Sequence, residues 1–259
     1  PDGELFFVDV KSGVIHCIKD PESSHPEVQE FATLKGASGL MFDAEGNLYA
    51  AGNRNKTIVR FMADGNPTTI ATGLAANDLV VVVHGVYFTC PPEKAVYYGP
   101  LNADSGVQSA VKVATGPERP NGLIVTPDRR FLHVVDSAGR YVWSYRVEPD
   151  GSLRHGQPYG YLHLPQDEVL TGADGATMTA DGTLIVATSS GLQIFDQPGR
   201  VHVITSRPPD SGKLTNCVFA GKDFKTIYVT IGDKVFRRKT KMQGIAPWQP
   251  PVQPPKPRL

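Results

Sequence analysis

A repeated unit of about 40 to 50 residues constrains the fold of this chain more than any other feature. A two-residue anchor that begins with Leu, Val or Ile recurs six times, with spacings of 43, 38, 46, 52 and 43 residues between successive anchors. The anchors are Leu5-Phe6, Leu48-Tyr49, Val86-Tyr87, Leu132-His133, Leu184-Ile185 and Ile227-Tyr228. Six anchors predict six structural units of similar design.

The second unit shows how one unit is organised. Short runs rich in β-branched, aromatic and aliphatic residues alternate with turns that contain Gly, Asp and Asn, which predicts short strands. The runs are Leu40–Phe42, Asn47–Ala51, Thr57–Phe61 and Thr68–Ala71, and residues 176–205 of the fifth unit repeat the pattern. Repeated four-stranded units are typical of a β-propeller, so we predict an all-β, six-bladed propeller with four-stranded antiparallel blades.

Two packed β-sandwiches would also contain many short strands, but they would not explain a fixed repeat with a polar residue at the same point of successive units. The inner strand of the first unit would precede Pro1 and is expected to be missing from this chain. A single propeller domain is predicted over residues 1–246. Residues 247–259 contain six prolines and are predicted to form an extended surface tail.

Composition excludes several classes of function. The chain has 26 basic and 26 acidic residues and a formal net charge of zero, which argues against a broad charged surface for nucleic acid or an anionic membrane. The longest uninterrupted apolar run, Leu79 to Val83, is strand-sized and too short for a transmembrane helix. The three cysteines, Cys17, Cys90 and Cys217, show no metal-binding spacing and are expected to be buried.

A polar residue stands at the head of a short apolar strand in four successive units: Asn77, Asn121, Asp174 and Asn216. The first residue of an inner strand lies at the channel mouth of a propeller, so these side chains and Ser38 are expected to face one shallow pocket. One carboxylate and two amides, from Asp174, Asn77 and Asn121, form a set of hard oxygen donors that favours Ca²⁺ over Zn²⁺.

The chemistry of such a site would centre on Asp174. A cation there would polarise a carbonyl or phosphoryl oxygen, and Asp174 would act as a general base on water or as a nucleophile. Arg119, next to Pro120 and Asn121, is a candidate for binding a substrate carboxylate or phosphate, although an outer salt bridge explains it equally well. Asn and Asp are also ordinary turn residues, but three of them in phase favour a site.

Four stretches at the inner strands carry a resemblance to a known family: Asn77–Val81, Pro120–Leu123, Ala173–Gly175 and Thr215–Gly221. In this order and phase they resemble the third to sixth blades of the gluconolactonase family, which includes regucalcin (senescence marker protein). The likeness extends over about residues 4–239. It implies a six-bladed propeller that binds one divalent cation in its channel and hydrolyses sugar lactones or other cyclic esters.

The resemblance also implies roles for individual residues. Asn121 and Asp174 match metal ligands, Asn77 matches a position used for the metal or the substrate, and Asp174 is the candidate base. Substrate-binding roles are expected for Ser38, Asn77, Arg119 and Asn216. The expected cofactor is a divalent cation, Ca²⁺ first, with Mg²⁺, Mn²⁺ or Zn²⁺ as alternatives, and the expected partner is a small lactone or ester.

Two departures from the family pattern affect this interpretation. The family's first ligand, a Glu in a Glu-Gly-Pro motif, would lie before Pro1, and its absence would weaken metal binding. Some members place an Arg two residues before the Asn that matches Asn77, and this chain has Ala75 there.

The sequence therefore predicts a divalent-metal-dependent hydrolase of lactones or related esters. The alternative is a non-catalytic propeller that serves as a binding or scaffold module with a degenerate metal site. A lyase or synthase of the strictosidine-synthase type shares the propeller but does not use the ring of metal ligands.

Overall fold

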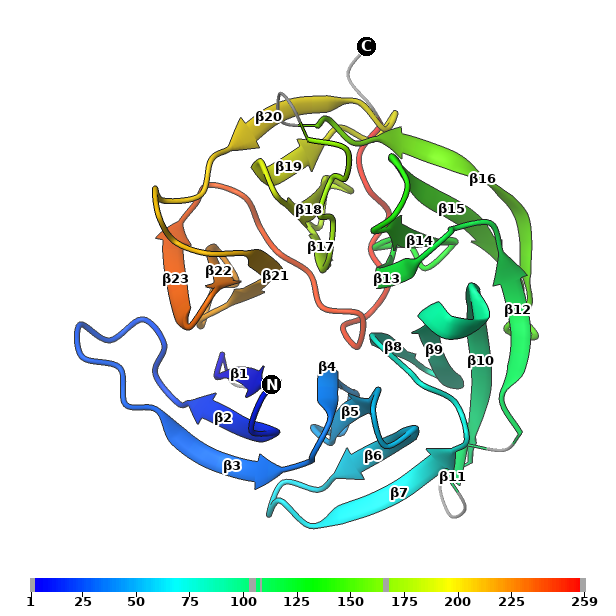
Figure 1. Cartoon of the computed structure of the whole chain (residues 1–259), viewed down its shortest axis with the longest axis horizontal. Helices are drawn as coiled ribbons and strands as arrows, with labels where there is room; N and C mark the ends of the chain where they lie inside the picture. The colour runs from blue at the N-terminus through cyan, green and yellow to red at the C-terminus, as the bar shows by residue number, and fades with distance from the viewer. Residues whose placement is uncertain (1–2, 103–105, 108, 165–167, 257–259) are drawn as a thin grey trace.

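The chain folds into six antiparallel sheets arranged around a central axis, as a β-propeller (Figure 1). The structure is a computed structural model, and it describes residues 3–102, 106–107, 109–164 and 168–256. Within these residues the only helical element is one short 3₁₀ turn, η1 (Pro91–Glu93). The predicted all-β, six-bladed architecture is confirmed.

The strands follow one another around the ring in sequence order. The first blade contains β1 (Leu5–Asp9), β2 (Val14–Ile18) and β3 (Gln29–Thr33), and the second contains β4 (Ala37–Phe42), β5 (Leu48–Gly52), β6 (Thr57–Phe61) and β7 (Pro67–Thr72). The third contains β8 (Leu79–Val82), β9 (Gly85–Cys90), β10 (Ala95–Asn102), β11 (Gly106–Val107) and β12 (Val111–Thr115). The fourth contains β13 (Pro120–Val125), β14 (Phe131–Asp136), β15 (Tyr141–Val147) and β16 (Leu153–Tyr161). The fifth contains β17 (Ala176–Met178), β18 (Leu184–Thr188), β19 (Gly191–Phe195) and β20 (Val201–Thr205), and the sixth contains β21 (Leu214–Ala220), β22 (Thr226–Ile231) and β23 (Lys234–Lys239).

The second, fourth and fifth blades have the predicted four strands. In the third blade both β11 and β12 pair with β10, so the outermost position is shared by two short strands. The first and sixth blades show three described strands each. The six sequence anchors lie in β1, β5, β9, β14, β18 and β22. From the second blade onward these are the second strands of their blades, so the repeat marks one position of the blade.

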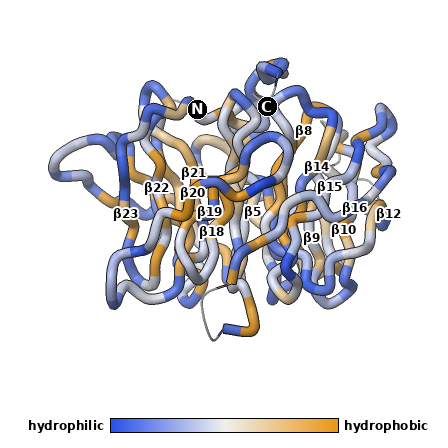
Figure 2. The backbone as a smooth tube through the Cα atoms, turned by 90° about the horizontal axis from the view of Figure 1, so that it is seen from above, coloured by the Kyte–Doolittle hydropathy of each residue, from blue (hydrophilic) through white to orange (hydrophobic). Residues whose placement is uncertain are grey.

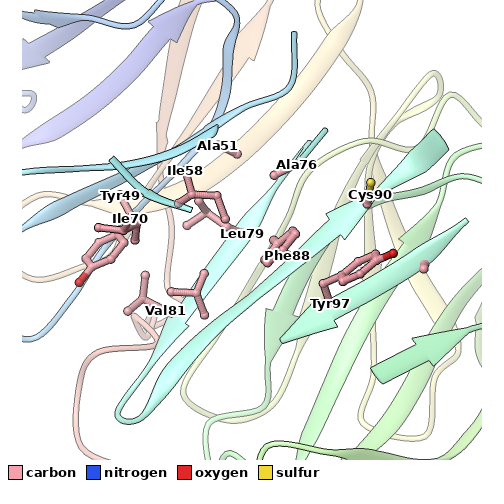
Figure 3. Packing of buried hydrophobic residues seen from close by; sticks show 12 residues of the cluster. Tyr49, Ala51, Ile58, Ile70, Ala76, Leu79, Val81, Phe88, Cys90 and Tyr97 are labelled. Carbon is pink, nitrogen blue, oxygen red and sulfur yellow. The ribbon is translucent and has the colours of Figure 1, made fainter. Parts of the chain in front are cut away.

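The hydrophobic core lies between neighbouring blades. All residues of β5, β9 and β18 are buried, because each of these strands is covered by a blade on either side. Between the second and third blades, Tyr49 and Ile58 pack with Leu79, Phe88 and Tyr97 (Figure 3). Hydrophobic residues follow the strands and hydrophilic residues gather at the turns (Figure 2). The three cysteines are buried and free, as expected.

Residues 242–256 leave the sixth blade and cross one face of the propeller. Their backbone is hydrogen-bonded to turns that follow three inner strands: Ala180 N–H to the Gln243 carbonyl (2.8 Å), Gly244 N–H to the Phe224 carbonyl (2.8 Å) and Val252 N–H to the Pro127 carbonyl (2.9 Å). This segment therefore lies at the end of the channel opposite the heads of the inner strands.

No helix among the described residues is long and apolar enough to cross a membrane.

His133 makes the stability of the fold dependent on pH. Its imidazole is buried in β14, stacks on Tyr159 with 4.4 Å between ring centroids, and its Nδ1 has no hydrogen-bond partner among the described residues. Burial lowers the pKa of His133 to about 4. The unfolded chain binds this proton first, near pH 6.5, so stability is lost as the pH falls from about 6.5 to about 4.

The variant His133→Phe is expected to keep the ring stacking and to remove this pH dependence. Wild-type stability should fall between pH 7 and pH 4 by about 3 kcal/mol more than the stability of the variant. Urea unfolding at several pH values measures the difference, and His202→Phe, at an exposed position, is the matched control. Parallel acid profiles of the wild type and His133→Phe would contradict the prediction.

Candidate functional site

Strand register aligns the inner strands of blades two to six. Each inner strand pairs with the second anchor residue of its blade, through Met41–Tyr49, Val80–Tyr87, Ile124–His133, Thr177–Ile185 and Val218–Tyr228. The residue three places before the paired inner-strand residue is called the head position here. The head positions are Ser38, Asn77, Asn121, Asp174 and Thr215.

This register corrects the expectation that Asn216 occupies the same place as the other three polar residues. Asn216 lies one residue after the head position, in line with Gly39, Asp78, Gly122 and Gly175. The pairing runs without a shift from Asn216–Thr230 to Val218–Tyr228, so Asn216 lies two residues before the paired Val218 instead of three. Thr215 is the residue in phase. Asn216 is exposed, and its Oδ1 accepts a hydrogen bond from Cys217 N–H (2.8 Å).

Hydrogen bonds between blades connect the head positions to one another. The carbonyl of each head residue from the third blade to the sixth accepts a hydrogen bond from the preceding blade. The pairs are Ser38 Oγ to Asn77 (2.5 Å), Thr89 Oγ1 to Asn121 (2.8 Å), Gly122 N–H to Asp174 (3.0 Å) and Gly175 N–H to Thr215 (2.8 Å). These contacts hold the heads side by side around one end of the channel.

Glycine after the head position permits the close approach of the blades. A Cβ on Gly122 would overlap the Asp174 carbonyl oxygen and lie 2.8 Å from the Gly175 Cα. A Cβ on Gly175 would overlap the side chain of Asn216. The absence of these two side chains therefore places the inner strand of the fifth blade, with Asp174 at its head, in direct contact with both neighbours.

The Asp174 carboxylate forms an ion pair with a side chain of the next blade. Its side chain is 21% exposed, and Lys213 Nζ lies 2.7 Å from its Oδ2. Burial raises the pKa of Asp174, while Lys213, the nearby side chain of Asn121 and the charge of Arg119 oppose the rise. A raised pKa makes the carboxylate a better proton acceptor near neutral pH.

The predicted site residues are thus brought together to different degrees. Asn121 and Asp174 are neighbouring heads, and the Asn121 side chain lowers the pKa of the Asp174 carboxyl. Ser38 and Asn77 are half-buried and are joined through the Asn77 carbonyl. Arg119 is exposed, and its backbone N–H donates to Asp136 Oδ1 (3.0 Å), which fixes the chain just before Asn121.

Sequence reasoning missed Lys213. Its signal is visible only in the corrected register, where it lies two residues before the head Thr215, as Arg119 lies two residues before Asn121. The backbone supports the equivalence, because Ser137 N–H donates to the Arg119 carbonyl (3.0 Å) and Gly232 N–H donates to the Lys213 carbonyl (2.9 Å).

Asp78 is a second carboxylate that sequence reasoning did not select. It follows the head residue Asn77, is half-buried, and its Oδ1 accepts a hydrogen bond from Leu79 N–H (2.9 Å). Burial raises the pKa of Asp78 to about 7, and the negative charge of Asp174 contributes to the rise. In the sixth blade the equivalent position holds Asn216, which is neutral.

Asp78→Asn is expected to stabilise the protein at pH 8. Folding raises the pKa of this carboxyl from its ordinary value of 3.8 to about 7. The protonated carboxyl therefore adds stability below pH 3.8, and that added stability is lost as the pH rises through about 7. The variant should therefore gain about 2 kcal/mol over the wild type at pH 8 and less at pH 5. Urea unfolding in the presence of a chelator measures this, with Asp223→Asn, at an exposed turn, as the control. A variant that is less stable at both pH values would contradict the prediction.

The chain is similar in sequence to a protein of known activity. The gluconolactonase of Zymomonas mobilis is 26% identical over 247 residues, which cover 81% of this chain and 64% of that protein. The chain thus spans less than two thirds of the length of that relative.

Two solved structures share the fold. The gluconolactonase of Xanthomonas campestris superposes with a TM-score of 0.75 at 20% identity, covering 94% of this chain and 83% of that one. A luciferin-regenerating enzyme superposes with a TM-score of 0.73 at 18% identity, covering 95% and 90%. Residues 1–233 match the SMP-30/Gluconolactonase/LRE-like region, and the chain therefore belongs to the SMP-30/gluconolactonase family.

Proposed function

We propose that this protein is a divalent-metal-dependent hydrolase of lactones or related esters. The observation that carries the proposal is the alignment of Asn77, Asn121 and Asp174 at the head position of three consecutive blades, joined by hydrogen bonds at one channel mouth. The gluconolactonase names of the relatives in Zymomonas and Xanthomonas support a lactone as the substrate.

The donor chemistry of the three head residues fits a hard divalent cation. Among the described residues, no group of three or more His, Cys, Asp and Glu comes together. The proposed donors are one carboxylate, from Asp174, and the amide oxygens of Asn77 and Asn121. Oxygen-only sets of this kind suit Ca²⁺. When bound, the cation would supply Lewis acidity towards the lactone carbonyl oxygen.

The protein's own groups account for the proton transfer. Asp174, with its raised pKa, accepts the proton of a water molecule that attacks the lactone carbonyl carbon, or attacks that carbon itself. When water attacks, the carbon–oxygen bond of the ring ester breaks, the ring oxygen takes up the proton held by Asp174, and the product is a hydroxy acid. When Asp174 attacks, ring opening leaves the acyl group on Asp174, and a water molecule then releases the same hydroxy acid, supplies the proton for the ring oxygen and restores the carboxylate. Asn121, the head residue of the preceding blade, is the neighbour proposed to orient the Asp174 carboxylate.

A panel of lactones, assayed with Ca²⁺, Mg²⁺, Mn²⁺ and Zn²⁺ and after chelation, tests the proposal. Hydrolysis is expected with at least one cation, and chelation should abolish it. Calorimetric titration with Ca²⁺ gives a second readout that does not depend on the choice of substrate. Full activity after exhaustive chelation would refute metal dependence, and the absence of both metal binding and turnover would favour a non-catalytic binding module.

A further inference from the structure

Arg119 and Lys213 occupy the same position in the two blades that flank Asp174. Each lies two residues before the head residue of its blade, and each has its carbonyl bonded to the corresponding N–H at the end of the second strand. Small residues hold the equivalent positions in the other aligned blades, namely Gly36, Ala75 and Gly172. Cationic side chains at this position are therefore confined to the fourth and sixth blades.

Two cationic residues flank the Asp174 carboxylate, one in each neighbouring blade. Lys213 Nζ lies 2.7 Å from Asp174 Oδ2, and the lysine side chain is 60% exposed. Arg119 is exposed and forms no salt bridge within the described part of the chain. Its neighbour Glu118 is already paired with Lys94 at 2.6 Å. Arg119 is thus an exposed cation, two residues before the head of the blade next to Asp174, with no salt-bridge partner among the described residues.

We propose that Arg119 and Lys213 form an anion-recognising pair, and that the preferred substrate is a lactone with a negatively charged substituent, either carboxylate or phosphate. The guanidinium supplies two parallel N–H donors for such a group. The Lys213 side chain is 60% exposed in its pair with Asp174, so an anionic substituent can reach the ammonium group and compete for it. This inference rests on the proposed lactone hydrolysis and names the substrate class for that same site.

The test compares two substrates that differ only in charge: glucono-1,5-lactone and the same lactone with a 6-phosphate. The measured quantity is kcat/KM for the phosphorylated lactone divided by kcat/KM for the neutral one. Wild-type protein should favour the phosphorylated lactone, and Arg119→Gln should lower the ratio about tenfold. Arg119→Lys should retain part of the preference because it keeps the charge. Lys35→Gln removes an exposed lysine next to β4 and should leave the ratio unchanged.

The possible outcomes separate the two proposals. Hydrolysis of the neutral lactone with no preference for charge, and a ratio unchanged in Arg119→Gln, would overturn the anion-recognising pair and leave lactone hydrolysis intact. Hydrolysis of neither lactone, nor of any other lactone in the panel, would overturn the proposed function and this inference with it. Inhibition by inorganic phosphate adds a direct readout, and it should weaken in Arg119→Gln but not in Lys35→Gln.

Discussion

Replacement of Asp174 by Asn is expected to lower kcat/KM for lactone hydrolysis by about a thousandfold. Asn has nearly the same shape, so the contact between the fourth and fifth blades should persist. It carries no negative charge and cannot accept a proton from water, and it loses the ion pair with Lys213 Nζ (2.7 Å). Steady-state kinetics at pH 7, on a lactone that the wild type hydrolyses, measures the effect.

A second Asp in the same blade provides the control for Asp174→Asn. Asp196 pairs with Arg200 at 2.8 Å in the turn between β19 and β20, at the opposite end of the blade from the head position. Asp196→Asn should therefore keep nearly full activity. Both variants are checked for native circular dichroism and unfolding midpoint. If folded Asp174→Asn retained more than about a tenth of the wild-type kcat/KM, its role as the base or nucleophile would be rejected.

The fold was predictable because its contacts within each blade are local. Most neighbouring strands of a blade are consecutive in sequence, so the hydrophobic runs and the Gly- and Asp-containing turns encode each blade directly. The predicted strand Thr57–Phe61 coincides with β6. The predicted run Leu40–Phe42 is shorter than β4, Ala37–Phe42, because Ser38 and Gly39 are polar or small and do not mark a strand by hydrophobicity.

The candidate site was only partly predictable. Asn77, Asn121 and Asp174 align correctly because each lies at the same distance from its anchor-paired residue. The expected phase of Asn216 is wrong because the paired residues Val218 and Tyr228 are ten positions apart, against nine for Ile124 and His133, and the sequence anchors do not show how the turn between the two strands takes up the extra residue. Lys213 meets Asp174 across 39 positions of sequence, and a pairing of this kind depends on how two blades pack, which a repeat within one blade does not encode.

The fourth and fifth blades pack so closely at Gly122 that a side chain at this position should lower both stability and activity. Gly122→Ala is expected to destabilise the protein by about 2 kcal/mol or more, because the new methyl group would overlap the backbone of the next blade. It would collide with the Asp174 carbonyl oxygen and approach the Gly175 Cα at 2.8 Å. Relief of this overlap must move the head of the fifth blade and stretch the hydrogen bond from Gly122 N–H to the Asp174 carbonyl (3.0 Å).

The kcat/KM of the folded Gly122→Ala variant should also fall, because displacement of a catalytic group by about 1 Å can cost about a hundredfold in rate. Gly73→Ala separates this collision from backbone strain. Gly73 has a φ of +95° and nothing within 4 Å of an added Cβ, so its substitution should cost about 1 kcal/mol of stability and leave kcat/KM near the wild-type value. Denaturant unfolding and kinetics on the folded fraction distinguish the two variants. Equal kinetic behaviour of Gly122→Ala and Gly73→Ala would show that contact between these blades does not position Asp174.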